Sequence, residues 1–556
     1  MRSQPFARYR IAPMATPVSA PESAPTGGHA TSPARMPRQI PYIIANEGCE
    51  RFSFYGMRNI LTTFLAGTFF AGLSTAGAES EAKDIFHVFV AGVYFFPLLG
   101  GWLSDRFFGK YHTILWVSVV YCLGHACLAA FETQPAGFYF GLFLIALGSG
   151  GIKPLVSTFM GDQFDQRNKH LAKVAFDGFY WIINFGSFFA SLIMPKLLAG
   201  WGPAAWWGLS PASVAFGVPG VLMAIATVFF RIGRKRYVIV PQAPPDPHAF
   251  TRVVRTALLA RGGGGSRPGL VVAVAGGVLA LGSVALIPLL GWTGGKDIVI
   301  ALCLALVFLL AGIGRGAWMQ LERARGSHPD DAVDGVRSVL RVLVIFALVT
   351  PFWSLFDQKA STWVFQAGAM TKPEWFSPAQ MQAVNPALVM LLIPFNNLVI
   401  FPWMRRRGRE PSQLGRMGLG IALAGASWIA AGALQLVLDA GQPVSIAWQL
   451  LPYVLLTSGE VLVSATGLEF AYSQAPASLK GTIMSFWSLA VTVGNLWVLI
   501  VNAAVKNDAV NGAILGTGLS VIAFQMFFFA AFAFAAALAF HAVARRHRMV
   551  DNYRAA

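Results

Sequence analysis

The chain has 556 residues, of which 55% are hydrophobic and only 12% are charged, and its mean hydropathy is +0.58. This composition excludes a soluble globular protein, which would need far more polar surface at this length. The net charge of +17 does not indicate nucleic acid binding, because the basic residues gather in alternate loops. We therefore expect a protein that spans the lipid bilayer many times and has no nucleic acid partner.

Apolar runs of about 20 residues alternate with short polar loops, and each run is long enough to cross a bilayer core of about 30 Å as a helix. The expected spans are 42–72, 84–103, 111–131, 137–160, 172–199, 211–231, 268–291, 297–316, 338–368, 380–403, 415–437, 446–472, 480–505 and 516–543. These fourteen spans predict an all-α integral membrane protein. Lysine and arginine concentrate in alternate loops, which predicts that both termini are cytoplasmic.

The two longest inner segments flank the seventh and eighth spans and contain the glycine- and proline-rich stretches typical of linkers. Without this central pair, six spans remain on each side, the arrangement of two helical bundles around a cavity. The predicted parts are a disordered cytoplasmic tail, an N-terminal six-helix bundle, linkers with a two-helix insertion, a C-terminal six-helix bundle and a cytoplasmic tail. Their bounds are 1–40, 41–232, 233–337, 338–543 and 544–556.

The first span carries four charges on one helical face, at Glu47, Glu50, Arg51 and Arg58. Each charge at membrane depth costs about 2.5–3.5 kcal/mol on insertion scales, so it needs a partner or a water-filled cavity. One explanation is a structural ion pair that only locks helix packing. We favour the other, a functional site.

Further polar residues lie inside later spans. His87 and Tyr94 share a helical face, and Lys153 sits in a Gly-Gly-Ile-Lys-Pro stretch that permits a bend. An alternative interpretation of His87 is a neutral ring that only packs against its neighbours. A lone asparagine in a span, such as Asn184, more often forms a hydrogen bond between helices than a contact to a ligand. The second half adds Arg341, Trp353, Asp357, Asn385, Asn396, Glu460, Trp487 and Asn495. The four cysteines lie in predicted spans and indicate neither disulfides nor a metal site.

Four motifs in order resemble those of the proton-dependent oligopeptide transporters, over about residues 42–505. They are Glu47-x-x-Glu50-Arg51-Phe52 with Tyr55, the Gly-Gly-Ile-Lys-Pro stretch at 150–154, the segment 179–187, and the segment 459–476. The Gly- and Arg-rich inner loop at 100–111 also resembles the signature loop of the major facilitator superfamily. The resemblance implies a major facilitator fold of two six-helix bundles plus two extra central helices, as in bacterial members.

The resemblance also implies roles for individual residues. Proton coupling falls to Glu47, Glu50 and Arg51, linked to Lys153, and a His87 to Asp357 relay is expected. Residues around the bound peptide are Tyr55, Arg58, Tyr94 and Asn184, with Arg58 and Lys153 near its carboxylate. Glu460, helped by Asn385, is expected to receive the amino group, and Trp353 and Trp487 to wall side-chain pockets.

Two positions depart from the family pattern. Asn396 stands where animal members have an acid that pairs with the arginine matched by Arg341, which weakens the expectation of a gating ion pair at Arg341. Phe54 replaces a second tyrosine found in many relatives.

The predicted function is a proton-coupled symporter that imports di- and tripeptides, and secondarily peptidomimetics, by alternating access. We expect a monomer in a bacterial inner membrane, with protons as the coupling ion and no cofactor or metal. A membrane enzyme would need a nucleophile or metal set, which the sequence does not offer. An ion channel would conduct without alternating access.

Overall fold

The computed structural model describes residues 36–165, 168–202, 208–240, 246–261, 265–290, 295–408, 411–474 and 480–547. Most of both predicted tails, and parts of the predicted linkers, lie outside these ranges. Within them the structure is helical, with two isolated β-bridges and no strand, which confirms the all-α prediction.

The first part of the chain forms seven of the helices. They are α1 Ile40–Thr68, α2 Thr75–Phe95, α3 Pro97–Leu103, α4 Gly109–Ala130, α5 Pro135–Gly161, α6 Lys169–Leu198 and α8 Pro211–Ile232. The rest are α9 Phe250–Leu259, α10 Pro268–Leu289, α11 Gly295–Gln320, α12 Asp330–Asp357, α13 Thr362–Ala369, α14 Val384–Phe395, α15 Phe401–Arg406, α16 Gln413–Asp439, α17 Leu450–Gln474, α18 Lys480–Val505, α19 Asp508–Leu515 and α20 Val521–Arg546.

Twelve helical segments are long and apolar enough to cross a membrane. One of them, Thr75–Ala130, has 56 residues and contains two of the predicted spans. The charged helix α1 is not among the twelve. If Thr75–Ala130 crosses twice and α1 also crosses, the described part of the chain makes fourteen passes, the predicted number.

The turn between the second and third spans differs from the prediction of a loop at 100–111. Helix α3 runs to Leu103, a wide π-helical turn covers Ser104–Phe108, and α4 begins at Gly109. Gly109 has a φ of 70°, which a residue with a side chain adopts only with strain. The glycine therefore reverses the chain without an extended loop.

Buried apolar side chains form two large clusters. One draws on residues 40–237 together with Ala360, and the other on residues 253–540. The clusters are the two hydrophobic cores against which the polar site described below is built. The bounds of the predicted domains themselves stay a prediction.

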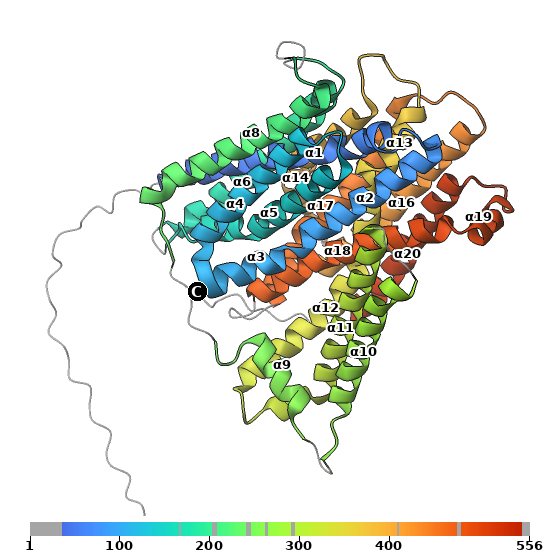
Figure 1. Cartoon of the computed structure of the whole chain (residues 1–556). Coiled ribbons are helices and arrows are strands. Elements are labelled where there is room, and N and C mark those ends of the chain that lie inside the picture. The colour runs from blue at the N-terminus through green and yellow to red at the C-terminus, as the bar shows by residue number, and fades with distance from the viewer. Residues whose placement is uncertain are drawn as a thin grey trace, which may run out of the picture.

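Helices α10 and α11 lie against each other at the edge of the molecule (Figure 1). Glycines allow their backbones to approach closely, since a Cβ on Gly276 would lie 2.6 Å from the carbonyl oxygen of Phe308. A small cluster around Ile300 joins α11 to Leu496 of α18 and Val88 of α2. Helix α11, one of the two helices that are central in the sequence, therefore contacts a helix from each of the two cores.

A glycine contact between α3 and α5 gives a test of this packing. We expect Gly100→Ala to destabilise the protein by about 1–3 kcal/mol, because the new Cβ would overlap the carbonyl of Gly151, which is backbone and has no room to move. Gly101→Ala is the matched control, since no atom lies within 4 Å of a Cβ there. Thermal unfolding of the purified protein in detergent compares them, and equal shifts would contradict the packing.

Candidate functional site

The ionic motif of α1 is buried and internally paired. Glu47, Glu50 and Arg51 are each no more than 3% exposed, and the Nε of Arg51 lies 2.6 Å from Oε1 of Glu47 and 2.8 Å from Oε2 of Glu50. Glu47 lies one helical turn before Arg51 and Glu50 directly precedes it, and both carboxylates reach the guanidinium. Ser149 of α5 donates a hydrogen bond to Glu50 at 3.4 Å. Of the residues predicted for proton coupling, the three on α1 are therefore together.

Lys153 lies apart from these carboxylates. Its Nζ donates to the hydroxyl of Tyr94 at 3.0 Å, and it lies 4.1 Å from the ring centroid of Tyr94 and 5.1 Å from that of Phe54. Among the described residues no carboxylate lies within ion-pair distance of it, so the expected link from Glu50 to Lys153 is not a direct ion pair here. Phe54, the departure from the family pattern, keeps an aromatic face against the ammonium.

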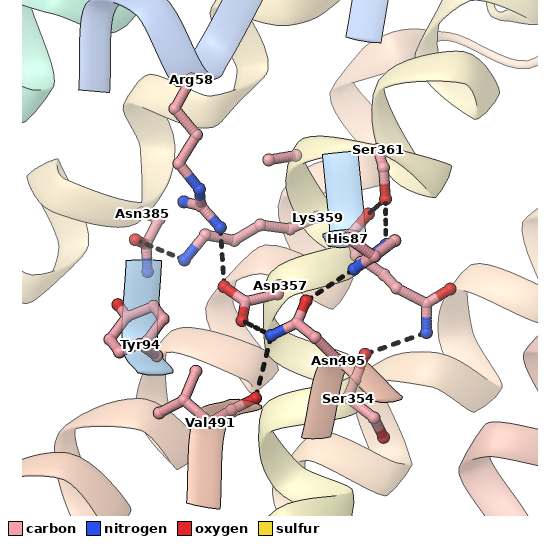
Figure 2. A network of polar contacts seen from close by, with 12 residues as sticks. Arg58, His87, Tyr94, Ser354, Asp357, Lys359, Ser361, Asn385, Val491 and Asn495 are labelled. Carbon is pink, nitrogen blue, oxygen red and sulfur yellow. Dashed lines mark hydrogen bonds and ion pairs between the residues drawn. The ribbon is translucent and has the colours of Figure 1, made fainter. Parts of the chain in front are cut away.

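Arg58 pairs across the molecule. Its Nη2 lies 2.6 Å from Oδ1 of Asp357, at the end of α12, and both side chains are almost fully buried (Figure 2). The guanidinium also lies 5.2 Å from the ring centroid of Phe86. A residue predicted to hold substrate and one predicted to carry protons thus neutralise each other.

His87 reaches Asp357 through an intermediate. Its Nδ1 lies 2.7 Å from Oδ1 of Asn495, whose Nδ2 donates to Oδ2 of Asp357 at 2.8 Å (Figure 2). Because the Asn495 amide donates to the carboxylate, its oxygen faces His87 and accepts, which places the proton on Nδ1. Nε2 lies 3.0 Å from the hydroxyl of Ser361. His87 and Asp357, the predicted relay, are therefore connected through Asn495. No role was predicted for Asn495.

A second cation lies beside Asp357. Lys359, in the 3₁₀ turn that follows α12, is 5% exposed and donates to Oδ1 of Asn385 at 2.9 Å, while the Asn385 amide donates to Oε2 of Glu460 at 2.5 Å. Asn385 and Glu460 are therefore together, as predicted. Lys359 was missed by the sequence analysis, although a lysine two residues after Asp357 in an apolar span was a visible signal.

The two predicted pocket tryptophans lie together. The rings of Trp353 and Trp487 are 6.0 Å apart and nearly perpendicular, and both are buried. Each is seated on a glycine of a neighbouring helix, Trp353 on Gly494 and Trp487 on Gly467.

The remaining predicted site residues are more dispersed. Tyr55 is half-buried beside Phe54, with ring centroids 5.4 Å apart. The Asn184 amide donates to the carbonyl of Tyr180 in its own helix at 3.0 Å. Arg341 is exposed on α12 and lies 5.7 Å from the ring centroid of Trp318 on α11, with no ion pair to a described residue. Its gating role stays a prediction.

Helices α2 and α18 pack against each other and are joined by polar contacts. They run antiparallel, with Lys506 2.7 Å from Asp84, Asn502 donating to Asp84 at 3.1 Å, and Thr492 donating to the carbonyl of Ala91 at 3.2 Å. The loop charges predict that this end faces outside the cell. These contacts therefore join the two helices on the predicted outer side. Among the described residues there is no cluster of metal-ligating side chains.

Comparison with known proteins identifies the family. The profile of the POT family, PTR2, matches residues 111–515. The chain belongs to the POT family. Its long helices and its ionic residues at membrane depth are thus those of a multi-pass membrane transporter family, as the motifs predicted, and not of a membrane enzyme.

Solved structures of POT transporters are similar over nearly the whole chain. A crystal structure of an auto-inhibited POT family peptide transporter is 64% identical, with a TM-score of 0.88 over 94% of this chain and 99% of that one. An in meso crystal structure of the POT transporter PepTSo is 63% identical, with a TM-score of 0.87 over 92% and 99%. The predicted major facilitator fold is therefore confirmed.

More distant relatives are animal solute carriers. Solute carrier family 15 member 2 of Oryctolagus cuniculus is 32% identical over 444 residues, which cover 78% of this chain and 54% of that protein. The chain spans about half the length of the curated relatives it matches.

The buried pair between Arg58 and Asp357 gives a test of the site. We expect Asp357→Asn to destabilise the protein by about 3–5 kcal/mol, because it leaves the Arg58 charge buried without a counter-ion. The double variant Arg58→Gln/Asp357→Asn should recover most of this loss. Unfolding of the detergent-solubilised protein by increasing denaturant measures each change.

The control is Asp162→Asn, which breaks the partly exposed pair with Lys110 inside the N-terminal part of the chain. Its expected cost is at most about 1 kcal/mol. A double variant of Arg58 and Asp357 that costs the sum of its two single changes would contradict the pairing.

Proposed function

We propose that the chain is a proton-coupled symporter that imports di- and tripeptides across a bacterial inner membrane by alternating access. Peptidomimetics are proposed as secondary substrates, protons as the coupling ion without a cofactor, and a monomer as the working form. Both termini are proposed to be cytoplasmic. The observation that carries the proposal is the Arg58 to Asp357 ion pair, which joins the two halves at the depth where the other predicted site residues gather.

The charges favour a zwitterionic peptide as the substrate. Arg58 and Lys153 belong to α1 and α5, and Glu460 belongs to α17 in the other half of the chain. A carboxylate attracted to the two cations and an ammonium attracted to Glu460 would bridge the halves. Because such a site recognises the peptide ends, the expected specificity for side chains is broad, with Trp353 and Trp487 as apolar walls.

Proton coupling follows from competition for Arg58. A proton that adds to Asp357 removes the charge that holds Arg58, which weakens a contact that closes the outer side and frees the guanidinium for the peptide carboxylate. Hydrogen bonds of 2.7 and 2.8 Å through the Asn495 amide hold His87 and Asp357 in one network, so a proton on either group changes the surroundings of the other. Protonation of Glu50 or Glu47 would act in the same way on Arg51. A potential of 100 mV contributes about 2.3 kcal/mol per proton, which favours import by more than tenfold.

Uptake into proteoliposomes tests the function. With an inside-negative potential and an acidic exterior, we expect concentrative uptake of labelled di-alanine that is lost when the proton gradient is collapsed. Unlabelled di- and tripeptides should compete, and free alanine should not. Uptake that does not respond to the gradient would contradict symport, and substrate-independent currents would indicate a channel.

Glu50→Gln serves as the internal control for coupling in the same assay. It should reduce gradient-driven uptake at least tenfold while peptide exchange at equal pH continues, because the amide cannot take up the coupling proton. Equal loss of both activities would exclude the coupling role of Glu50 and leave transport itself unchallenged.

A further inference from the structure

A groove of about 830 Å³ is lined by residues of α11, α12 and α20, none of which belongs to the site described above except Arg341, whose gating role is only a prediction. All three helices have their predicted cytoplasmic ends nearby: α11 ends at Gln320, α12 begins at Asp330 and α20 ends at Arg546. The groove is therefore expected at the level of the inner leaflet. It separates the central helix α11 from two helices of the second core.

The cytoplasmic end of the groove is cationic. Arg315 of α11, Arg341 of α12 and Arg546 of α20 line it from three different helices, and all three are exposed. No described carboxylate pairs with any of them. The contrast with nearby Arg337 is clear, since that residue forms ion pairs with Glu322 and Asp334. Glu322 and Asp334 are thus already paired with another arginine. The three arginines of the groove have no described carboxylate as a partner.

Two further side chains at this end are suited to an interfacial ligand. Trp318 is 37% exposed and lies beside Arg341, where an indole contributes both an apolar face and a donor. The Nε2 of His547 is buried without a hydrogen-bond partner among the described residues. Burial, and secondarily the charge of Arg341, hold the pKa of the His547 ring below its usual value. The ring is therefore neutral at pH 7 and adds a hydrogen-bonding atom, not a charge.

The walls away from this end are apolar. On α11 the groove continues from Arg315 to Leu310, and on α12 it continues from Arg341 to Ala347, along both helices toward the membrane interior. Val344, between these last two, is 52% exposed. The groove thus has a cationic head and an apolar body aligned with the membrane depth, which matches one kind of molecule.

We propose that this groove binds an anionic phospholipid of the inner leaflet, with its phosphate among the three arginines and an acyl chain along the apolar walls. Guanidinium groups suit phosphate oxygens because they donate paired hydrogen bonds. Basic pockets between membrane helices on the cytoplasmic side are favourable sites for such headgroups. The lipid would fill the groove between α11 and the helices α12 and α20, and its contacts would hold these three helices together. This inference does not depend on the transported substrate.

Native mass spectrometry of the delipidated full-length protein tests the proposal. Phosphatidylglycerol is titrated against phosphatidylethanolamine with the same acyl chains. We expect phosphatidylglycerol to bind at least tenfold more tightly. Arg315→Gln/Arg341→Gln/Arg546→Gln should reduce this preference to less than threefold, and Arg546→Gln alone, at an exposed helix end, should reduce it measurably if the triple variant does not fold.

The matched control is Arg231→Gln/Arg234→Gln/Lys235→Gln, which removes three exposed cations at the cytoplasmic end of α8 and should keep the preference. Ala311→Trp fills the apolar wall without changing charge and should weaken both lipids at least tenfold. Equal binding of the two lipids by the parent protein would overturn the proposal. So would displacement of phosphatidylglycerol by an equal concentration of glycerol phosphate, which would identify a soluble phosphate as the ligand.

Discussion

The buried ion pair between Arg58 and Asp357 is the constraint on which the remaining site depends. The two residues are 299 positions apart, yet their charges lie 2.6 Å from each other with almost no exposure. Burying two charges has a large desolvation cost, and removing one of them leaves the other unpaired. The pair is therefore stable only while both groups are charged. A proton on the Asp357 carboxylate, or a competing anion at the Arg58 guanidinium, removes the attraction that offsets the cost of burying the two charges. Alternating access, as proposed for this chain, would require a contact of this kind.

The turn that ends α12 makes polar contacts with three other helices, α1, α14 and α2. Within residues 357–361, Asp357 pairs with α1, Lys359 bonds to Asn385 of α14, and Ser361 bonds to His87 of α2. A change of charge at one of these positions alters the surroundings of the other two within a few ångströms. This proximity connects α2, which packs on α18, to the cation and carboxylate groups proposed for peptide binding. A lipid in the proposed groove, which is lined by an earlier part of α12, would anchor the same helix to α11.

The sequence predicted what is local and missed what depends on packing. The fourteen passes and the α1 triad follow from apolar run length and from the spacing of Glu47, Glu50 and Arg51, which one helix fixes. The partner of Arg58 could not be deduced from spacing, because it lies on a distant helix. Lys153 was expected to be linked to Glu50, and the sequence could not show that the ammonium instead contacts Tyr94 and Phe54 directly and makes no direct ion pair with a described carboxylate. Lys359 could have been noticed as a charge inside an apolar span, but its bond to Asn385 on another helix could not have been deduced from spacing.

Distance measurement between spin labels on the outer side tests the central claim most directly. Labels at exposed Leu73, which follows α1, and Trp375, which follows α13, report on the two halves. A short distance should dominate in membranes at pH 7.5. Acid pH with a dipeptide, or Asp357→Asn at pH 7.5, should add a longer distance to at least a tenth of the molecules. A distribution unchanged by acid, peptide and this substitution would contradict an outer closure controlled by the Arg58 to Asp357 pair.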